Sequence, residues 1–90
     1  MISCNRSSKF NIVTTEDWIN VVSSANSVED IDEAYCSMSQ NQIKNIGEEL
    51  TYMVSHLKNN DAQKRAKCRA FHYIFQLSAA HKEDSLAELN

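Results

Sequence analysis

The sequence contains no proline, and Gly47 is the only glycine in 90 residues. Proline and glycine interrupt helices and shape tight turns, so their scarcity argues against a turn-rich β fold and favours helices. A chain of this size buries only about 60–65% of the surface that its unfolded form exposes. We therefore expect an all-α fold, a small bundle of three to four helices that homodimerisation completes.

Long hydrophobic runs are also missing. Hydrophobic residues make up 42% of the chain, but no run approaches the ~20 apolar residues of a membrane-spanning helix. The N-terminal segment lacks the apolar core of a secretory signal. We expect a cytoplasmic protein with no membrane partner. Cys4, Cys36 and Cys68 are odd in number and far apart, so we expect free, inert thiols in a reducing compartment.

Capping signals divide the chain into an N-terminal arm, residues 1–13, and a single helical domain, residues 14–90. The arm is either frayed or an extended piece that packs Phe10 and Ile12 against the bundle. Each predicted helix follows a residue that can cap it: Thr14 or Thr15, Ser27, Ser39, and Asn60 or Asp61. The last long helix is expected over 62–81, followed by a short terminal helix or tail. Whether the second helix runs unbroken into the third stays open.

Apolar residues recur at helical spacing along all of these segments. Gly47 falls within the apolar stripe of the third helix, where it costs about 1 kcal/mol relative to alanine and indicates a close helix crossing. The expected core consists of Trp18, Ile31, Tyr35, Ile43, Ile46, Leu50, Val54, Leu57, Ala66, Ala70, Tyr73, Ile74 and Leu77.

The last long helix has an apolar arc wider than a surface helix needs. Phe71 and Phe75 lie beyond its core side and would form an exposed aromatic ridge on a lone bundle. Ridges of this kind usually mark an interface, so we expect Phe71 and Phe75 at the homodimer contact.

Charge is segregated along the chain. Residues 14–57 carry eight acids and one base, a net charge of −7, whereas residues 58–82 carry six bases and one acid, a net charge of +5. The basic helix either pairs with the acidic helices at their rims or faces an anionic partner. The acidic set is Glu29, Asp30, Asp32, Glu33, Glu48 and Glu49. The basic set is Lys64, Arg65, Lys67, Arg69 and His72.

No pattern indicates catalysis or a cofactor. Cys68 and His72, one helical turn apart, are half a metal site that Cys36, His56 or His81 would have to complete. Glu49, Tyr52 and His56 line one polar face, which is far more often a solvated surface than a proton-transfer site. Neighbouring cations could activate the Cys68 thiol only if it is exposed. We predict no enzyme, no catalytic residue, no metal and no cofactor.

Two hypotheses about function follow. The first is a protein that binds and regulates another protein through its acidic surface, as an inhibitor or adaptor. Small acidic helical proteins of phages and bacterial mobile elements often act in this way, an analogy of size and charge. The alternative is a nucleic-acid or nucleotide-binding module that uses the strip Lys64–Arg69. The net charge of −3 makes nucleic acid the less expected partner.

Overall fold

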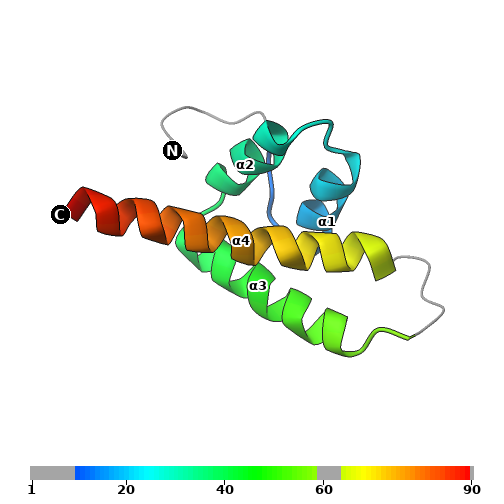
Figure 1. Cartoon of the computed structure of the whole chain (residues 1–90). Coiled ribbons are helices and arrows are strands. Elements are labelled where there is room, and N and C mark those ends of the chain that lie inside the picture. The colour runs from blue at the N-terminus through cyan, green and yellow to red at the C-terminus, as the bar shows by residue number, and fades with distance from the viewer. Residues whose placement is uncertain (1–9, 59–63, 90) are drawn as a thin grey trace.

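The computed structural model describes residues 10–58 and 64–89, with the backbone alone described for residues 84–89. It contains four helices, α1 (Thr15–Ser24), α2 (Val28–Cys36), α3 (Gln40–Ser55) and α4 (Lys64–Leu89), and no strand among the described residues (Figure 1). The predicted all-α fold is confirmed. Within these residues, no helix combines the length and the apolarity needed to cross a bilayer.

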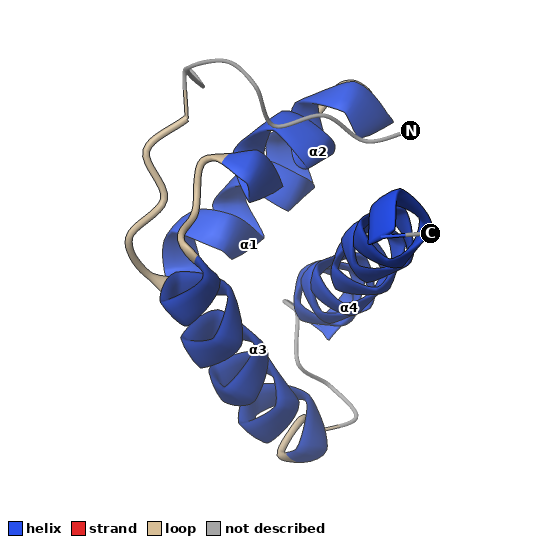
Figure 2. Cartoon of the chain, turned by 90° about the vertical axis from the view of Figure 1, so that its left-hand side faces the viewer, coloured by secondary structure: helices blue, strands red, loops and turns tan. Residues whose placement is uncertain are grey.

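Helix α4 organises the molecule. It lies with α3 along one side and with α1 and α2 along another, and its C-terminal end projects past the other helices (Figures 1 and 2). The prediction of a separate terminal helix or tail after residue 81 is wrong, because α4 continues to Leu89. The segment 82–89 contains neither proline nor glycine, so nothing in it stops the helix. The predicted caps Asn60 and Asp61 lie outside the described residues.

Reciprocal capping boxes start α1 and α3. The Thr14 hydroxyl accepts from Asp17 N at 3.2 Å, and Asp17 Oδ2 accepts from Thr14 N at 3.1 Å. Ser39 and Gln42 repeat this exchange at α3, with distances of 3.2 and 2.8 Å. The second helix does not run unbroken into the third, because the extended backbone of the cap residue Ser39 separates α3 from α2.

Asp17 also accepts from Val13 N at 3.0 Å. The backbone N–H groups of Val13 and Thr14 favour the charged carboxylate and lower the pKa of Asp17 from its ordinary value of 3.8.

We expect Asp17→Asn to destabilise the protein at neutral pH, with a difference from wild type that shrinks in acid. Because the folded-state pKa lies below the unfolded value, the contribution is complete above pH 3.8 and is lost as the pH falls through the folded pKa. Urea unfolding of both proteins from pH 7 downward measures this difference. If the difference in unfolding free energy between the two proteins is as large below pH 3 as at pH 7, the charge of Asp17 does not contribute to stability.

One hydrophobic core joins all four helices. Nine of the expected residues are buried: Trp18, Ile31, Tyr35, Ile43, Ile46, Leu50, Ala70, Ile74 and Leu77. Four expected residues are only half-buried: Val54, Leu57, Ala66 and Tyr73. The prediction did not include five buried hydrophobic residues: Ile12, Ile19, Val22, Ala34 and Met38. Ile12 is 3% exposed and Phe10 packs beside the core, so residues 10–13 follow the extended alternative for the arm.

Trp18 holds α1 against α4. Its side chain is fully buried, and its indole Nε1–H donates to the carbonyl oxygen of Ala70 at 2.9 Å. Ala70 is itself 0% exposed, and its small side chain lets the indole reach the helix backbone. Ala70 is therefore the point at which α1 and α4 approach closely.

Gly47 is buried on the side of α3 that faces α4, but the close backbone crossing predicted at this position is not observed among the described residues. Its closest neighbour is a side chain rather than backbone, because a Cβ built at position 47 would lie 3.6 Å from Phe75 Cζ. This distance is an ordinary van der Waals contact, so a methyl group fits without displacing the ring.

We therefore expect Gly47→Ala to stabilise the protein by about 0.5–1 kcal/mol, the difference in helix propensity between the two residues. Urea unfolding measures the change, and Thr51→Ala one turn later on α3 serves as a control for alanine substitution beside the same groove. Destabilisation by Gly47→Ala would show that the Phe75 ring cannot tolerate the contact.

Candidate functional site

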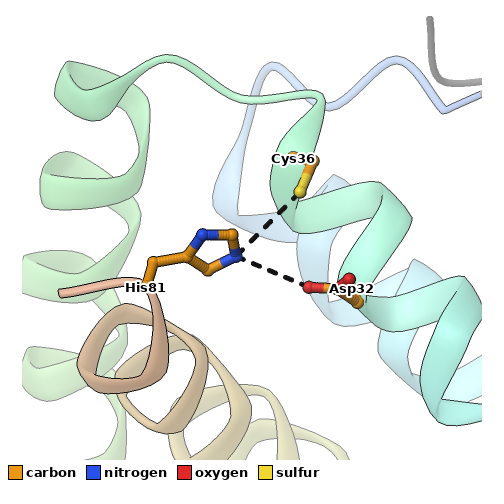
Figure 3. A group of neighbouring side chains, drawn as sticks. All are labelled: Asp32, Cys36 and His81. Carbon is orange, nitrogen blue, oxygen red and sulfur yellow. Dashed lines mark hydrogen bonds and ion pairs between the residues drawn. The ribbon is translucent and has the colours of Figure 1, made fainter. Parts of the chain in front are cut away.

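A polar cluster joins α2 to the C-terminal half of α4. His81 Nε2 of α4 lies 3.5 Å from Asp32 Oδ1 and 4.0 Å from Cys36 Sγ of α2 (Figure 3). The side chains of His81 and Asp32 are 22% and 25% exposed. Ligand atoms of the three residues all lie within 4.8 Å of one another. An imidazole, a carboxylate and a sulfur atom thus converge on one small volume.

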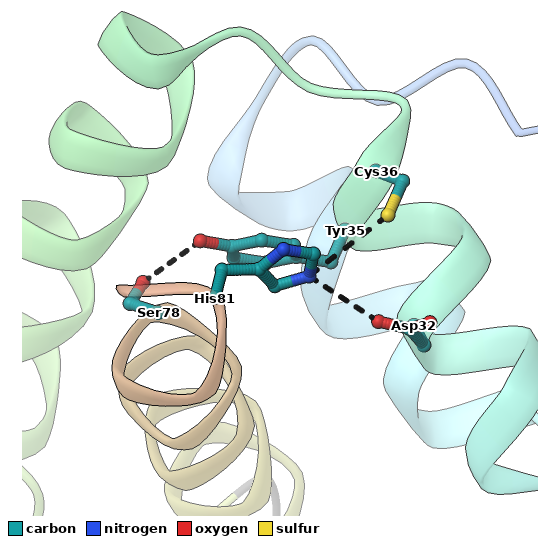
Figure 4. A network of polar contacts seen from close by, with 5 residues as sticks. All are labelled: Asp32, Tyr35, Cys36, Ser78 and His81. Carbon is teal, nitrogen blue, oxygen red and sulfur yellow. Dashed lines mark hydrogen bonds and ion pairs between the residues drawn. The ribbon is translucent and has the colours of Figure 1, made fainter. Parts of the chain in front are cut away.

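Tyr35 and Ser78 fix the position of this cluster. The Tyr35 ring stacks on the His81 ring with centroids 4.9 Å apart and an interplanar angle of 24°. The Tyr35 hydroxyl and Ser78 Oγ are hydrogen-bonded at 3.1 Å, which ties the same tyrosine to α4 (Figure 4). A cavity of about 470 Å³ opens beside the cluster, lined by Tyr35, Gln40, Ser78, His81 and Lys82.

The cysteines do not all behave as the sequence predicted. Cys36 is disulfide-bonded, so the expectation of free thiols is wrong for this residue. Cys68 is a free, half-buried thiol. Among the described residues, Cys68 and the exposed His72 belong to no group of three possible metal ligands. The half-site that the sequence suggested is therefore not completed by Cys36, His56 or His81.

A second feature is an apolar groove between α3 and α4. It measures about 380 Å³ and is lined by Ile43, Lys44, Gly47, Glu48, Thr51, Ile74, Phe75 and Ser78. Phe75 stands at this groove with 47% of its surface exposed. Lys44 and Glu48 lie one helical turn apart on α3, so the groove carries one charge of each sign. We refer to this feature as the α3–α4 groove.

The two residues predicted at a dimer contact differ in burial. Phe71 packs half-buried against the core, whereas Phe75 is the more exposed ring. Their rings contact each other with centroids 4.9 Å apart. Of the two rings predicted to form an exposed ridge, only Phe75 is exposed, and Phe71 is half-buried.

The six acids of the predicted acidic surface are not gathered on one face. Four of them belong to α2, and the side chain of Asp32 there faces His81. On α3, Glu48 lines the α3–α4 groove, whereas Glu49 accepts a hydrogen bond from Thr15 of α1 at 2.5 Å. The remaining members, Glu29, Asp30 and Glu33, lie along α2, with Glu29 exposed.

The basic set occupies the N-terminal part of α4. Lys64, Arg65, Arg69 and His72 are exposed, and Lys67 is half-buried. Neither Arg65 nor Arg69 forms an ion pair with any acid that the structure describes. Arg69 instead lines a cavity of about 200 Å³ beside Tyr73 and the turn between α1 and α2. The internal pairing that one interpretation of the charge pattern required is not observed for these arginines.

The polar line on α3 does not form a proton-transfer site. The Tyr52 and His56 rings stack with centroids 4.1 Å apart, and His56 Nδ1 lies 2.8 Å from the Tyr52 carbonyl oxygen. Glu49 is directed to Thr15, away from both rings. These side chains complete local helix contacts and do not converge on a shared point.

Part of the polar cluster left a signal in the sequence. Asp32 and Cys36 are four residues apart, which places them on one side of α2, but this pair was not singled out. His81 could not be assigned to the same point, because its position depends on how far α4 runs and on its rotation against α2.

Comparison of the chain with protein-family models, with curated protein sequences and with solved structures finds no match.

Proposed function

We propose that this protein is a non-enzymatic binding protein that regulates another protein, as an inhibitor or adaptor, by holding an amphipathic helix of that partner in the α3–α4 groove. The observation that carries the proposal is Phe75, a large ring that is 47% exposed beside an apolar groove. Exposed aromatic residues at apolar concavities are characteristic of protein-binding sites.

The dimensions and charges of the groove define the partner. A cavity of ~150 Å³ accepts a benzene-sized molecule, so about 380 Å³ holds two side chains of leucine or phenylalanine size. Two such side chains at spacing i, i+3 or i, i+4 are the anchors of a helix bound in a groove. Glu48 and Lys44 would pair with a base and an acid on the flanks of that helix.

This proposal revises the predicted binding face. Of the six acids, Glu48 keeps a place in the binding surface because it lines the groove, and the acids of α2 are given no part in it. The cytoplasm remains the expected location. Homodimerisation also remains an expectation, and a second copy of the chain is then the competing occupant of the same groove.

Selection from a displayed library of amphipathic helical peptides tests the proposal. We expect enriched peptides to carry two apolar anchors one turn apart and a neighbouring base. Phe75→Ser should weaken their binding at least about 30-fold, the factor that corresponds to a hot spot of 2 kcal/mol. Glu48→Lys should weaken it as well. Tyr52→Ser is the matched control, since Tyr52 is 65% exposed on α3 but does not line the groove.

Two results would overturn the proposal. One is a selection that enriches no peptide, or peptides that bind the Phe75→Ser protein as well as wild type. The other is sedimentation at micromolar concentration that shows a wild-type dimer and a Phe75→Ser monomer, which would assign the groove to a second copy of this chain.

A second candidate function rests on the exposed arginines. Arg65 and Arg69 face solvent without an ion pair among the described acids, and cations in this state are available to phosphate groups. On this alternative, the strip Lys64–Arg69 binds a nucleic acid or a nucleotide.

Fluorescence anisotropy with a labelled single-stranded oligonucleotide tests the alternative. Binding should weaken as salt rises and should disappear in the double variant Arg65→Gln/Arg69→Gln, whose stability should change by less than about 0.5 kcal/mol. Binding that survives in the double variant, or that does not depend on salt, would exclude this strip as a phosphate site.

A further inference from the structure

One carboxylate oxygen of Asp32 is buried without a hydrogen-bond partner among the described residues. Its Oδ1 atom is buried and accepts no hydrogen bond from any residue that the structure describes, although His81 Nε2 stands 3.5 Å away at ion-pair distance. Buried polar atoms are normally satisfied, and an orphaned carboxylate oxygen is an acceptor in need of a cation or a donor. A cavity of about 470 Å³ lies on the side of His81, which lines it together with Tyr35 and Ser78.

The three side chains match the ligand preferences of Zn²⁺. Zinc binds thiolate sulfur at about 2.3 Å and imidazole nitrogen or carboxylate oxygen at about 2.0–2.2 Å, in tetrahedral geometry. Ligand atoms around such an ion are therefore about 3.2–3.8 Å apart. The separations of 3.5 Å (His81–Asp32) and 4.0 Å (His81–Cys36) are close to this range, and no pair exceeds 4.8 Å.

The imidazole is already oriented for this purpose. Stacking on Tyr35 holds the His81 ring so that Nε2 points toward α2, and the hydrogen bond between Tyr35 and Ser78 ties the tyrosine to α4 (Figure 4). Groups that fix a ligand's orientation are the usual second layer of a metal site.

The disulfide of Cys36 prevents this cluster from binding a metal through sulfur, because a disulfide sulfur is not a thiolate ligand. We propose that reduction of this disulfide turns Asp32, Cys36 and His81 into a Zn²⁺ site, with water in the fourth position, so that metal binding depends on the redox state. A cellular dithiol supplies two electrons: its two thiols become a disulfide, the sulfur–sulfur bond of Cys36 breaks, and both protein sulfurs become thiols. The Cys36 thiol then releases its proton to solvent as the zinc–sulfur bond forms.

Cobalt titration of the 90-residue chain tests the proposal, with Co²⁺ as a spectroscopic substitute for zinc and a phosphine as a reductant that adds no thiol. In the reduced protein we expect one Co²⁺ per chain and a near-ultraviolet thiolate-to-cobalt charge-transfer band, which one equivalent of Zn²⁺ abolishes. The oxidised protein should show neither. Cys36→Ser should remove the band, and His81→Gln or Asp32→Asn should weaken binding more than about 100-fold, beyond the usual effect of a second-layer residue.

Cys68→Ser is the matched control, because it removes the free thiol and leaves the cluster intact. Circular dichroism of each variant confirms that it is folded, and the charge-transfer band reports sulfur coordination independently of stability. The proposal is overturned if the reduced wild type binds no stoichiometric metal, if Cys68→Ser rather than Cys36→Ser removes the band, or if oxidised and reduced proteins bind equally well.

Discussion

Replacing Trp18 with alanine is expected to lower the free energy of unfolding by about 3–5 kcal/mol, the usual cost of truncating a buried aromatic residue. Trp18 is 0% exposed, and its indole donates to Ala70 O across the contact between α1 and α4. A 90-residue domain has a total stability of roughly 5–13 kcal/mol. The substitution therefore removes a large share of the stability, and urea unfolding should show a lower midpoint with an unchanged slope.

Trp18→Phe separates the hydrogen bond from the ring. Phenylalanine keeps most of the apolar volume and loses the N–H donor, so we expect a loss of about 1–3 kcal/mol. The Ala70 carbonyl is not left unsatisfied, because it lies inside α4 and can accept the helical bond from Ile74 N. Tyr52→Ala is the matched control, an exposed aromatic within α3 whose loss should change stability by no more than about 0.5 kcal/mol. Equal effects at positions 18 and 52 would contradict the central role of Trp18.

Local rules predicted the helices well because the signals that start and stop them are local. The caps Thr14, Ser27 and Ser39 each bind an N–H group three residues ahead, and this exchange needs nothing beyond the adjacent turn. The same rules could not predict the length of α4. The segment after residue 81 was predicted to be a short terminal helix or tail, but no proline or glycine there breaks a helix.

Tertiary contacts determine which of the apolar residues on a helix are buried, and sequence periodicity alone does not. Phe71 and Phe75 occupy one sector of α4, yet Phe71 packs against the core while Phe75 stays 47% exposed over the small side of Gly47. A helical wheel treats both positions alike, because it does not include the neighbouring helix. Val54 and Leu57 continue the apolar stripe of α3, but Val54 lies in its last turn and Leu57 lies beyond its end, where fewer neighbours cover them.

The candidate sites show the same limit. The α3–α4 groove requires the spacing of two helices, and the polar cluster requires the register of His81 against Asp32 and Cys36. Neither quantity is encoded in a short motif. The charge segregation was visible in the sequence, but whether Arg65 and Arg69 pair or face solvent depends on which side of α4 packs inward.

Leu50→Ala is expected to produce the second large loss of stability, about 2–5 kcal/mol. Leu50 is 0% exposed in the middle of α3, and its truncation leaves a cavity that the four packed helices can only partly close. Leucine and alanine are both strong helix formers, so the change reports packing with little contribution from helix propensity. Leu50→Met, which nearly conserves volume, should cost less than about 1.5 kcal/mol.

Comparison of Leu50→Ala with Phe75→Ser separates a loss of stability from a loss of the proposed function. Phe75 is about half exposed, so its removal should cost at most about 1.5 kcal/mol, half of the value for a fully buried ring. Leu50 does not line the α3–α4 groove. In urea-free buffer we therefore expect Leu50→Ala to bind the selected helical peptides with nearly wild-type affinity per folded molecule, and Phe75→Ser to be stable and unable to bind. Parallel losses of binding and stability in both variants would show that the peptides recognise the intact fold as a whole, and that the ring of Phe75 is not the anchor of the groove.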